Sequence, residues 1–394
     1  MLVLILGLLT ATGPLATDLY LPAFPEIAED LGASEARIQL TLTAMMVGLA
    51  LGQLVIGPLS DACGRRGPLL VGVAVFTVAS FLCMLVPSAG VFVALRFVQG
   101  VAGAAGAVIS RAVVRDLFEG DDAARFFSRL MLVIGLAPLL GPILGGQLLL
   151  VGSWQLCFGV LGSVSALSFV VVFFWLPESL PRERRQAMNV AGLLATVWRL
   201  VRDARFVGPA LTLGVSFAMM FTYISAFSFV SQNEFGASAQ VYSAMFAINT
   251  VGLISGTQVN GFLIGRVGTS RRLAAGLVSA LVAVVGLVAL AFSGAAGLVP
   301  LTAVFFVMMF SMGFVLPNAT TLAISSQVPS VAGTASALMG SLQFALGGGL
   351  AALAGLTATG EATLVSMTTV MLGLGVVSVL VFVVVGRRAA RCAV

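Results

Sequence analysis

Residues 165–176, SALSFVVVFFWL, contain no charged side chain and no regular alternation of polar and apolar residues. Over the whole chain of 394 residues, 59% are hydrophobic and only 9% are charged, whereas about 25% are charged in soluble globular domains. This composition indicates an integral membrane protein. Lipid offers no hydrogen bonds to the backbone, so spanning segments are helices or closed barrels, and long runs without alternation favour helices. The predicted fold class is all-α.

Twelve segments are long enough to cross a bilayer, which takes about 20 apolar residues. They cover residues 2–24, 38–59, 69–86, 91–109, 130–151, 156–176, 207–230, 241–264, 273–292, 299–324, 335–356 and 364–385. One long connection separates the first six from the last six. We therefore expect an N-terminal six-helix bundle at 1–176, a cytoplasmic linker at 177–206 and a C-terminal six-helix bundle at 207–394. The linker contains a segment typical of an amphipathic helix lying on the membrane surface.

The arginines predict the orientation of these spans. All 20 basic residues are arginine, and every one except Arg37 and Arg96 falls on the same side of the predicted spans. Loops rich in arginine stay in the cytoplasm. We expect a multi-pass protein of the inner (plasma) membrane with both termini cytoplasmic. The basic residues form only short clusters, which argues against nucleic-acid binding. The four cysteines are far apart and histidine is absent, so no metal site is predicted.

Two charged residues fall inside predicted spans. Asp18 lies in ATDLYLPAFP, residues 16–25, about 24 Å along the first helix at 1.5 Å per residue. An acid there is either a protonatable group facing a cavity or an interfacial residue near the helix end. Arg96, in LRFVQG at 95–100, costs about 2.5–3.5 kcal/mol to insert and needs a cavity and a partner, unless it snorkels to the outer surface.

Two glycine-rich motifs frame these charges. GPLSDACGRRG at 57–67 places Asp61 at a helix end beside Arg65 and Arg66, and on its own could be a turn with topogenic arginines. A weak repeat of it, GFLIGRVGTSRR, has Gly265 in place of the aspartate. The fifth span contains GLAPLLGPILGG at 135–146, which favours close helix packing and a kink; its key residues are Pro138, Gly141, Pro142, Gly145 and Gly146.

These motifs resemble those of the major facilitator superfamily. The segment at 57–67 is similar to its G-x-x-x-D-x-x-G-R-[RK] loop, in which the aspartate pairs with a neighbouring helix and latches the outward-facing state. Arg96 matches its R-x-x-Q-G motif, which is linked to proton transfer. The fifth span resembles the G-x-x-x-G-P-x-x-G-G signature of its drug antiporters, which importers generally lack.

Five further segments narrow the resemblance. TDLYLPAFPEIAEDL, ISRAVVRDLF, FTYISAFSFVSQNEFG, GFVLPNATTLAI and AGTASALMGSLQFALGG are spread over the chain and are similar to the Bcr/CflA drug-resistance branch. That branch includes bicyclomycin and amphenicol exporters, and its first-helix acid is a proton site that Asp18 matches. In the C-terminal half the membrane-associated acids, Glu234 and Glu361, lie near outer helix ends. Glu26 is a second, more exposed candidate.

The resemblance implies proton-coupled efflux of small lipophilic drugs or antibiotics by alternating access. Asp18 would carry the proton, Arg96 would tune it, and Asp61, Arg65 and Arg66 would gate the cytoplasmic side. No cofactor is expected, and the chain is expected to act as a monomer in the lipid bilayer. An apolar, aromatic cavity is expected, with these candidate polar contacts: Tyr20, Tyr223, Asn249, Asn318 and Gln343. Two alternatives remain: an importer or facilitator on the same fold, and a membrane enzyme, for which no nucleophile, base or metal cluster is found.

The predicted topology can be tested with reporter fusions. Fusions near Arg125, Arg271 and Val394 should all report a cytoplasmic position, because each site lies on the arginine-rich side. A periplasmic signal from any one of them would contradict the count of twelve spans.

Overall fold

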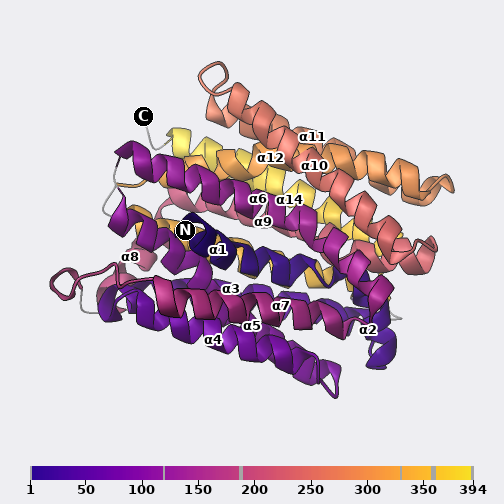
Figure 1. Cartoon of the computed structure of the whole chain (residues 1–394). Coiled ribbons are helices and arrows are strands. Elements are labelled where there is room, and N and C mark those ends of the chain that lie inside the picture. The colour runs from indigo at the N-terminus through magenta and orange to yellow at the C-terminus, as the bar shows by residue number, and fades with distance from the viewer. Residues whose placement is uncertain (1, 119, 186–189, 329–330, 356–360, 392–394) are drawn as a thin grey trace. The chain divides into compact units, whose positions relative to one another are not determined.

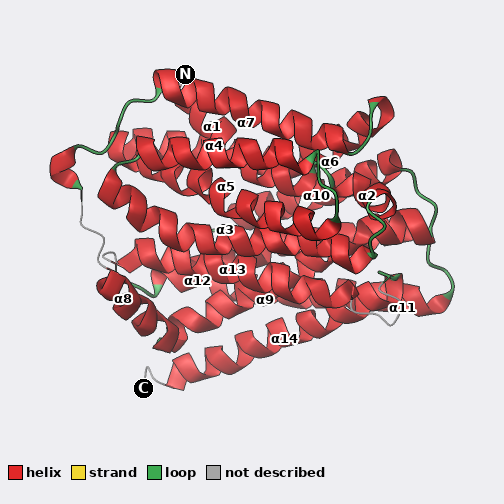
Figure 2. Cartoon of the chain, turned by 90° about the horizontal axis from the view of Figure 1, so that it is seen from below, coloured by secondary structure: helices red, strands yellow, loops and turns green. Residues whose placement is uncertain are grey.

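The computed structural model describes residues 2–118, 120–185, 190–328, 331–355 and 361–391, and the regular elements among them are helices (Figures 1 and 2). The all-helical prediction is confirmed for this part of the chain. Ten of its helices are long and apolar enough to cross a membrane. The end of the eleventh predicted span, Leu356, and linker residues 186–189 lie outside the described residues.

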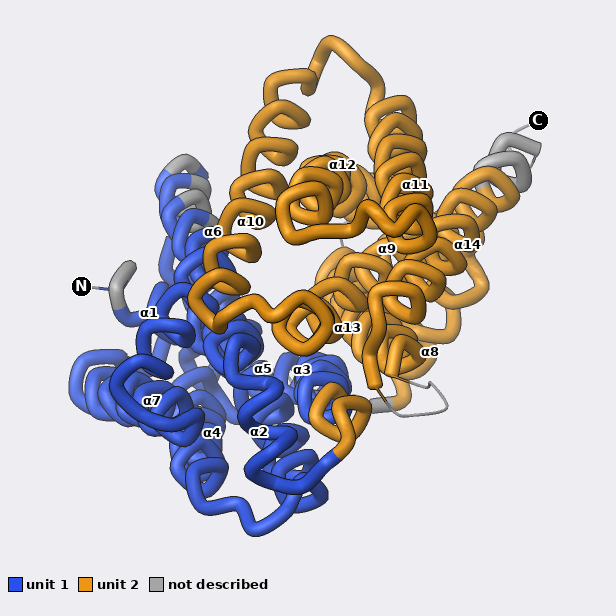
Figure 3. Tube along the Cα trace, turned by 90° about the vertical axis from the view of Figure 1, so that its right-hand side faces the viewer, with its two compact units in different colours: residues 1–33, 40–189 blue, residues 34–39, 190–394 orange. Residues whose placement is uncertain are grey.

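The chain forms two compact units, coloured separately in Figure 3. The first unit consists of residues 1–33 and 40–189. Its central helix α1 packs against α5, α6 and α7, and α4 packs against α5 and α7. The helices of this part of the chain are α1 (Leu2–Asp18), η1 (Leu21–Ala23), α2 (Phe24–Asp30), α3 (Glu35–Cys63), α4 (Arg66–Cys83), α5 (Ala89–Leu117), α6 (Gly120–Val151), α7 (Gln155–Trp175) and η2 (Arg182–Arg184).

The second unit consists of residues 190–394 together with residues 34–39, the start of α3. Its central helix α9 packs against α12, α13 and α14 and is buried over most of its length. The helices are α8 (Val190–Arg202), α9 (Ala204–Phe229), η3 (Val230–Glu234), α10 (Ala239–Phe262), α11 (Thr269–Ser293), α12 (Leu298–Ser325), α13 (Ala332–Ala351), η5 (Ala352–Gly355) and α14 (Leu364–Arg391).

The prediction of one continuous helix over residues 2–24 is wrong, because α1 ends at Asp18. Pro22 explains the break. Proline has no backbone N–H, so Pro22 cannot donate to the Asp18 carbonyl four residues earlier, and its ring clashes with that carbonyl in a continuous helix. The chain instead makes the turn η1, in which the Ala23 amide donates to the Tyr20 carbonyl at 3.0 Å.

Two of the twelve predicted spans are not among the ten membrane-crossing candidates. Helix α1 is 17 residues long after its early end, and α10 carries buried polar residues that include Asn249, Thr250 and Asn260. Ten spans are therefore supported by length and composition, and the count of twelve stays a prediction.

Glycines allow α6 to approach the end of α1 very closely. A Cβ atom on Gly145 would lie 1.9 Å from the Leu19 carbonyl oxygen, and one on Gly141 would lie 2.9 Å from the Asp18 Cβ. Both distances are below van der Waals contact, so only glycine fits without a shift of the backbone. Helix α6 continues through both of its prolines, Pro138 and Pro142. The predicted close packing of this motif is thus present, and its partner is the segment around Asp18.

This contact predicts that substitutions at two glycines of α6 have different effects on stability. Gly145→Ala should lower the free energy of unfolding by about 1–3 kcal/mol, the usual cost of overpacking a tight contact. Gly135→Ala is the matched control, because its Cβ would meet nothing within 4 Å and alanine is the better helix former. Thermal unfolding of the purified variants measures both. Equal stability of the two variants would contradict the packing of α6 on residues 18–19.

Candidate functional site

Asp18 is the last residue of α1 and is only 6% exposed. It lies where the helix breaks, with Gly141 of α6 directly beside its Cβ. The break removes the donors that would bond the last carbonyls of α1, so this helix end has polar groups that need other partners. Asp18 therefore combines a carboxylate, a helix end and a glycine contact at one point.

Arg96 of α5 supplies one of those partners. Its Nη2 donates to the Ala16 carbonyl at 2.7 Å, and its Nη1 donates to the Gln99 side-chain oxygen at 2.7 Å. The guanidinium carbon lies 4.4 Å from the centre of the Tyr20 ring, within the range of a cation–π interaction. Arg96 is fully buried, so its side chain does not reach the outer surface in this structure.

Arg96 contacts the turn of α1 that contains Asp18, but the two side chains do not form an ion pair. Within the described residues, every ion pair closer than 4.0 Å involves other side chains. The partners of Arg96 are neutral, and its Nε has no hydrogen-bond partner among the described residues. A buried guanidinium without a carboxylate keeps a positive potential at this end of α1.

A second charged cluster surrounds the turn between α3 and α4. Arg65 pairs with Asp61 and donates through Nε to Asp116 of α5 at 2.9 Å. Its Nη1 also donates to the Ser60 hydroxyl at 2.8 Å. Arg65 is buried, whereas the Asp61 side chain is 52% exposed and that of Asp116 is 17% exposed. The three side chains join the ends of three helices of the first unit.

Glu178, just after α7, closes this cluster from the linker side. Its carboxylate accepts hydrogen bonds from the amides of Arg65 at 2.7 Å and Leu180 at 3.0 Å. Gly64 has φ +95° and passes so close that a Cβ there would lie 2.6 Å from the Glu178 carboxylate. Partial burial opposes ionisation of Glu178, but the amide donors outweigh it, so its pKa lies below the ordinary value.

Arg66 has different partners from its neighbour. Its amide donates to Glu178 at 3.2 Å, and its guanidinium donates to the Phe173 carbonyl at 2.5 Å. The guanidinium carbon lies 5.8 Å from the centre of the Phe173 ring. Arg66 therefore ties the start of α4 to the end of α7.

The five predicted substrate contacts fall into different surroundings. Tyr20, in the first unit, is buried and shares a hydrogen bond of 3.0 Å with Thr41. Tyr223 and Asn249, in the second unit, are both buried, and the Asn249 Nδ2 donates to the Tyr223 hydroxyl at 2.8 Å. The Tyr223 ring packs against Phe305 with 4.4 Å between ring centres. The Asn249 Oδ1 accepts no hydrogen bond within the part of the chain that the structure describes.

The other two predicted substrate contacts, Asn318 and Gln343, also differ in their surroundings. Asn318 donates to the Asn260 side-chain oxygen at 2.7 Å, and Arg272 donates to the same oxygen at 3.0 Å. Asn318 is thus a member of a buried polar network, which gives it a structural role. Gln343 is half-buried on α13.

Sequence reasoning missed Asp116 and Glu178, and it left Glu26 as a proton-site candidate. Asp116 falls outside the predicted span 91–109, but it lies in the last turn of α5, which continues to Leu117. Glu178 follows the proline after the sixth predicted span. The available signal was an acidic residue on the same side of the predicted spans as the turn that contains Arg65 and Arg66. Glu26 accepts a hydrogen bond from the Trp154 amide at 3.1 Å, so it ties α2 to the start of α7.

Comparisons with known proteins agree with this architecture. The sequence matches the Major Facilitator Superfamily over residues 6–352. The chain is 39% identical to YdgK of Bacillus subtilis, named as an uncharacterized MFS-type transporter, over 97% of this chain and 94% of that one. It is 33% identical to a bicyclomycin resistance protein homolog of Haemophilus influenzae, over 88% and 86%. The crystal structure of a D-xylose-proton symporter shares the fold, with a TM-score of 0.75, 17% identity and 96% coverage of both chains.

The family match covers residues 6–352, a range that contains Asp18, Asp61, Arg96 and Gly141. A transporter family accounts for the buried charges without any enzymatic role. The chain belongs to the major facilitator superfamily, in its Bcr/CflA drug-resistance branch.

Proposed function

We propose that this transporter exports small lipophilic antibiotics or drugs, of the amphenicol or multidrug type, in exchange for protons. It works by alternating access between two six-helix bundles, which together contain twelve spans. It acts as a monomer without a cofactor, and both of its termini lie in the cytoplasm. The observation that carries the proposal is the position of Asp18, a buried carboxylate at the broken end of α1.

Asp18 has the properties that a proton site needs. It is buried, no cation lies within ion-pair distance among the described residues, and it ends a helix whose last carbonyls carry partial negative charge. A proton neutralises the carboxylate. When the proton leaves, the buried guanidinium of Arg96, which is bound to the Ala16 carbonyl two residues away, supplies a positive charge at this end of α1 that can stabilise the anion.

Gly141 and Gly145 link this site to the movement of α6. Because their contacts with residues 18–19 leave no room for a side chain, a change in the position of α6 has to change the surroundings of Asp18. This contact gives the glycine-proline motif a role in antiport. Its presence, together with relatives named for resistance to bicyclomycin and chloramphenicol, supports export over the alternative of an importer or facilitator.

Arg65, Asp61 and Asp116 form the proposed gate at the cytoplasmic ends of α3, α4 and α5, with Arg66 as a further tie to α7. Breaking these pairs would free the three helix ends to move relative to one another.

Tyr223 and Asn249 are the proposed substrate contacts of the second unit. Asn249 donates to Tyr223, whose ring packs against Phe305. The Asn249 Oδ1 accepts no hydrogen bond among the described residues, so it can accept one from an otherwise lipophilic molecule. Tyr20 and Gln343 remain weaker candidates, and Asn318 is engaged elsewhere.

Asp18→Asn should abolish uphill export and retain downhill flux or binding of a neutral substrate. One charge crossing 100 mV corresponds to about 2.3 kcal/mol, and about 1.4 kcal/mol supports each tenfold gradient. The wild type should therefore hold a gradient of about fiftyfold for a neutral drug at that voltage, and the variant should hold none. Vesicles with voltage and pH gradient imposed separately measure this.

Glu26→Gln is the matched control for that experiment, because it makes the same change of charge in α2, just beyond the break, and Glu26 has a structural partner in Trp154. It should keep proton-driven export. Undiminished uphill transport by Asp18→Asn would remove Asp18 from the mechanism.

Asp61→Asn should slow export by about twofold to fivefold and leave substrate affinity unchanged. The half-exposed pair with Arg65 is worth about 0.2–1 kcal/mol, and Arg65 retains Asp116. Asp116→Asn should slow export more, because this carboxylate is more buried and also accepts from Ser179 at 3.1 Å. Binding and flux measured on the same preparation test the gate, and an equal loss of both would place these residues in the substrate pocket.

A further inference from the structure

Helix α8 connects the linker to the first membrane helix of the second unit, and one side of it is covered by protein. Leu200 is buried, and Leu193 and Val197 are half-buried. The helix packs against α9 and α13 of the same unit. These contacts fix its position relative to the membrane helices of that unit.

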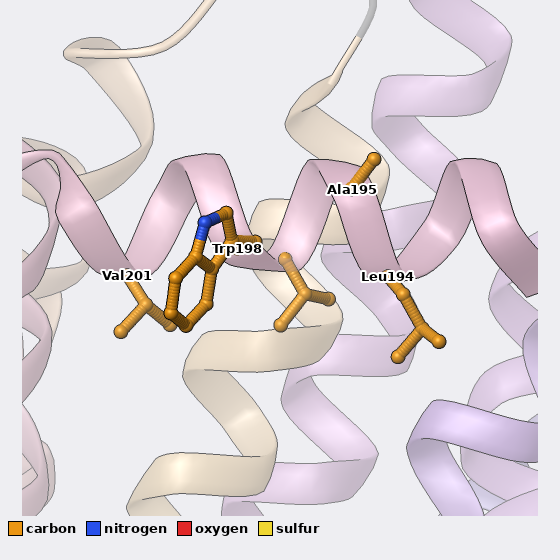
Figure 4. A pocket seen from close by; sticks show the side chains of 5 residues that line it. Leu194, Ala195, Trp198 and Val201 are labelled. Carbon is orange, nitrogen blue, oxygen red and sulfur yellow. The ribbon is translucent and has the colours of Figure 1, made fainter.

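A second apolar face of α8 is left uncovered. Leu194, Trp198 and Val201 are 61%, 60% and 49% exposed. They recur at intervals of four and three residues, which places them on one side of a helix. Figure 4 shows these three side chains along α8, where they line one shallow hollow together with Ala195 and Val197.

This face lies at the edge of a membrane helix. Asp203 alone separates α8 from α9, and the apolar segment Ala204–Glu234 is long enough to span the bilayer. Because one residue extends the chain by at most about 3.6 Å, the end of α8 is held at the end of that span. In Figure 2, α8 runs across the direction of α9.

Positive charge borders the uncovered face. The described helix Val190–Arg202 carries Arg199 and Arg202 and no acidic residue. The guanidinium carbon of Arg202 lies 4.2 Å from the centre of the Trp198 ring, so charge and apolar surface adjoin. The nearest acid in sequence, Asp203, is engaged, since it accepts from the Arg205 amide at 2.9 Å and from Gln327 at 2.7 Å.

We propose that α8 is a binding surface for anionic phospholipids. Leu194, Trp198 and Val201 lie in the boundary between headgroups and acyl chains, and Arg199 and Arg202 bind headgroup phosphates beside them. This goes beyond the transport function, because it assigns a partner and a chemistry to the linker.

The arrangement of charge favours lipid over a second protein copy as the occupant. An apolar face with arginines along its border matches a bilayer surface, where apolar chains lie beneath a layer of phosphate. Tryptophan is enriched at this depth because its ring is apolar and its N–H is polar. Arginine forms two parallel hydrogen bonds to a phosphate, which suits a headgroup.

The depth of α8 can be measured on the full chain in nanodiscs that hold one copy each. Phosphatidylcholine brominated near the headgroup should quench Trp198, and bromine near the bilayer centre should quench it much less. The contribution of Trp198 is obtained by subtracting the emission of Trp198→Phe, which leaves the other two of the three tryptophans. Absence of quenching by the shallow bromines would overturn the proposal, because water or protein would then cover this face.

The headgroup preference is tested by titrating short-chain phosphatidylglycerol or phosphatidylcholine into the solubilised protein while following Trp198 emission. Each basic residue near an anionic surface contributes about 1 kcal/mol, so Arg199→Gln with Arg202→Gln should weaken phosphatidylglycerol binding about thirtyfold. Phosphatidylcholine binding should not change. The matched control is Arg182→Gln with Arg184→Gln, two exposed arginines of η2 in the same linker. Equal losses in both double variants, or equal affinity for both lipids, would refute a headgroup site on α8.

Discussion

The end of α1 at Asp18 is the constraint on which the first unit depends. Pro22 removes the donor that the Asp18 carbonyl would have used, so the helix cannot continue. In a membrane protein the freed carbonyl groups must find partners inside the protein, since lipid supplies none. Arg96 binds another carbonyl of this helix end, that of Ala16, and it can do so because α5 packs directly against α1. The buried arginine, the broken helix and the carboxylate are therefore one arrangement.

Glycine enables both charged clusters, in two different ways. At the turn after α3, Gly64 adopts φ +95°, which ordinary residues avoid, and this lets two successive amides point at Glu178. On α6, Gly145 has ordinary helical geometry, and its value lies in the missing side chain that lets the Leu19 carbonyl approach. The first case fixes a turn, and the second lets two helices touch beside Asp18.

The sequence predicted the features that follow from composition, but it did not predict which side chains interact with one another. Long apolar runs predicted the helices, and motif spacing identified Asp18, Asp61 and Arg96 as unusual. The sequence also contained the cause of the break in α1, since Pro22 was visible, but hydropathy does not report a missing donor. Asp116 and Glu178 were not predicted as partners of Arg65, because they lie 51 and 113 residues away in the chain. Only the packing of α5 and the path after α7 bring them there.

The exclusive use of arginine fits the roles found in the structure. Arg96 binds a carbonyl and an amide oxygen and lies over an aromatic ring, and Arg65 binds two carboxylates and a hydroxyl. Both arginines use several N–H groups at fixed angles, and Arg96 also uses the flat face of its guanidinium. A lysine ammonium has neither a flat face nor a fork of donors, and it loses its proton more readily when buried.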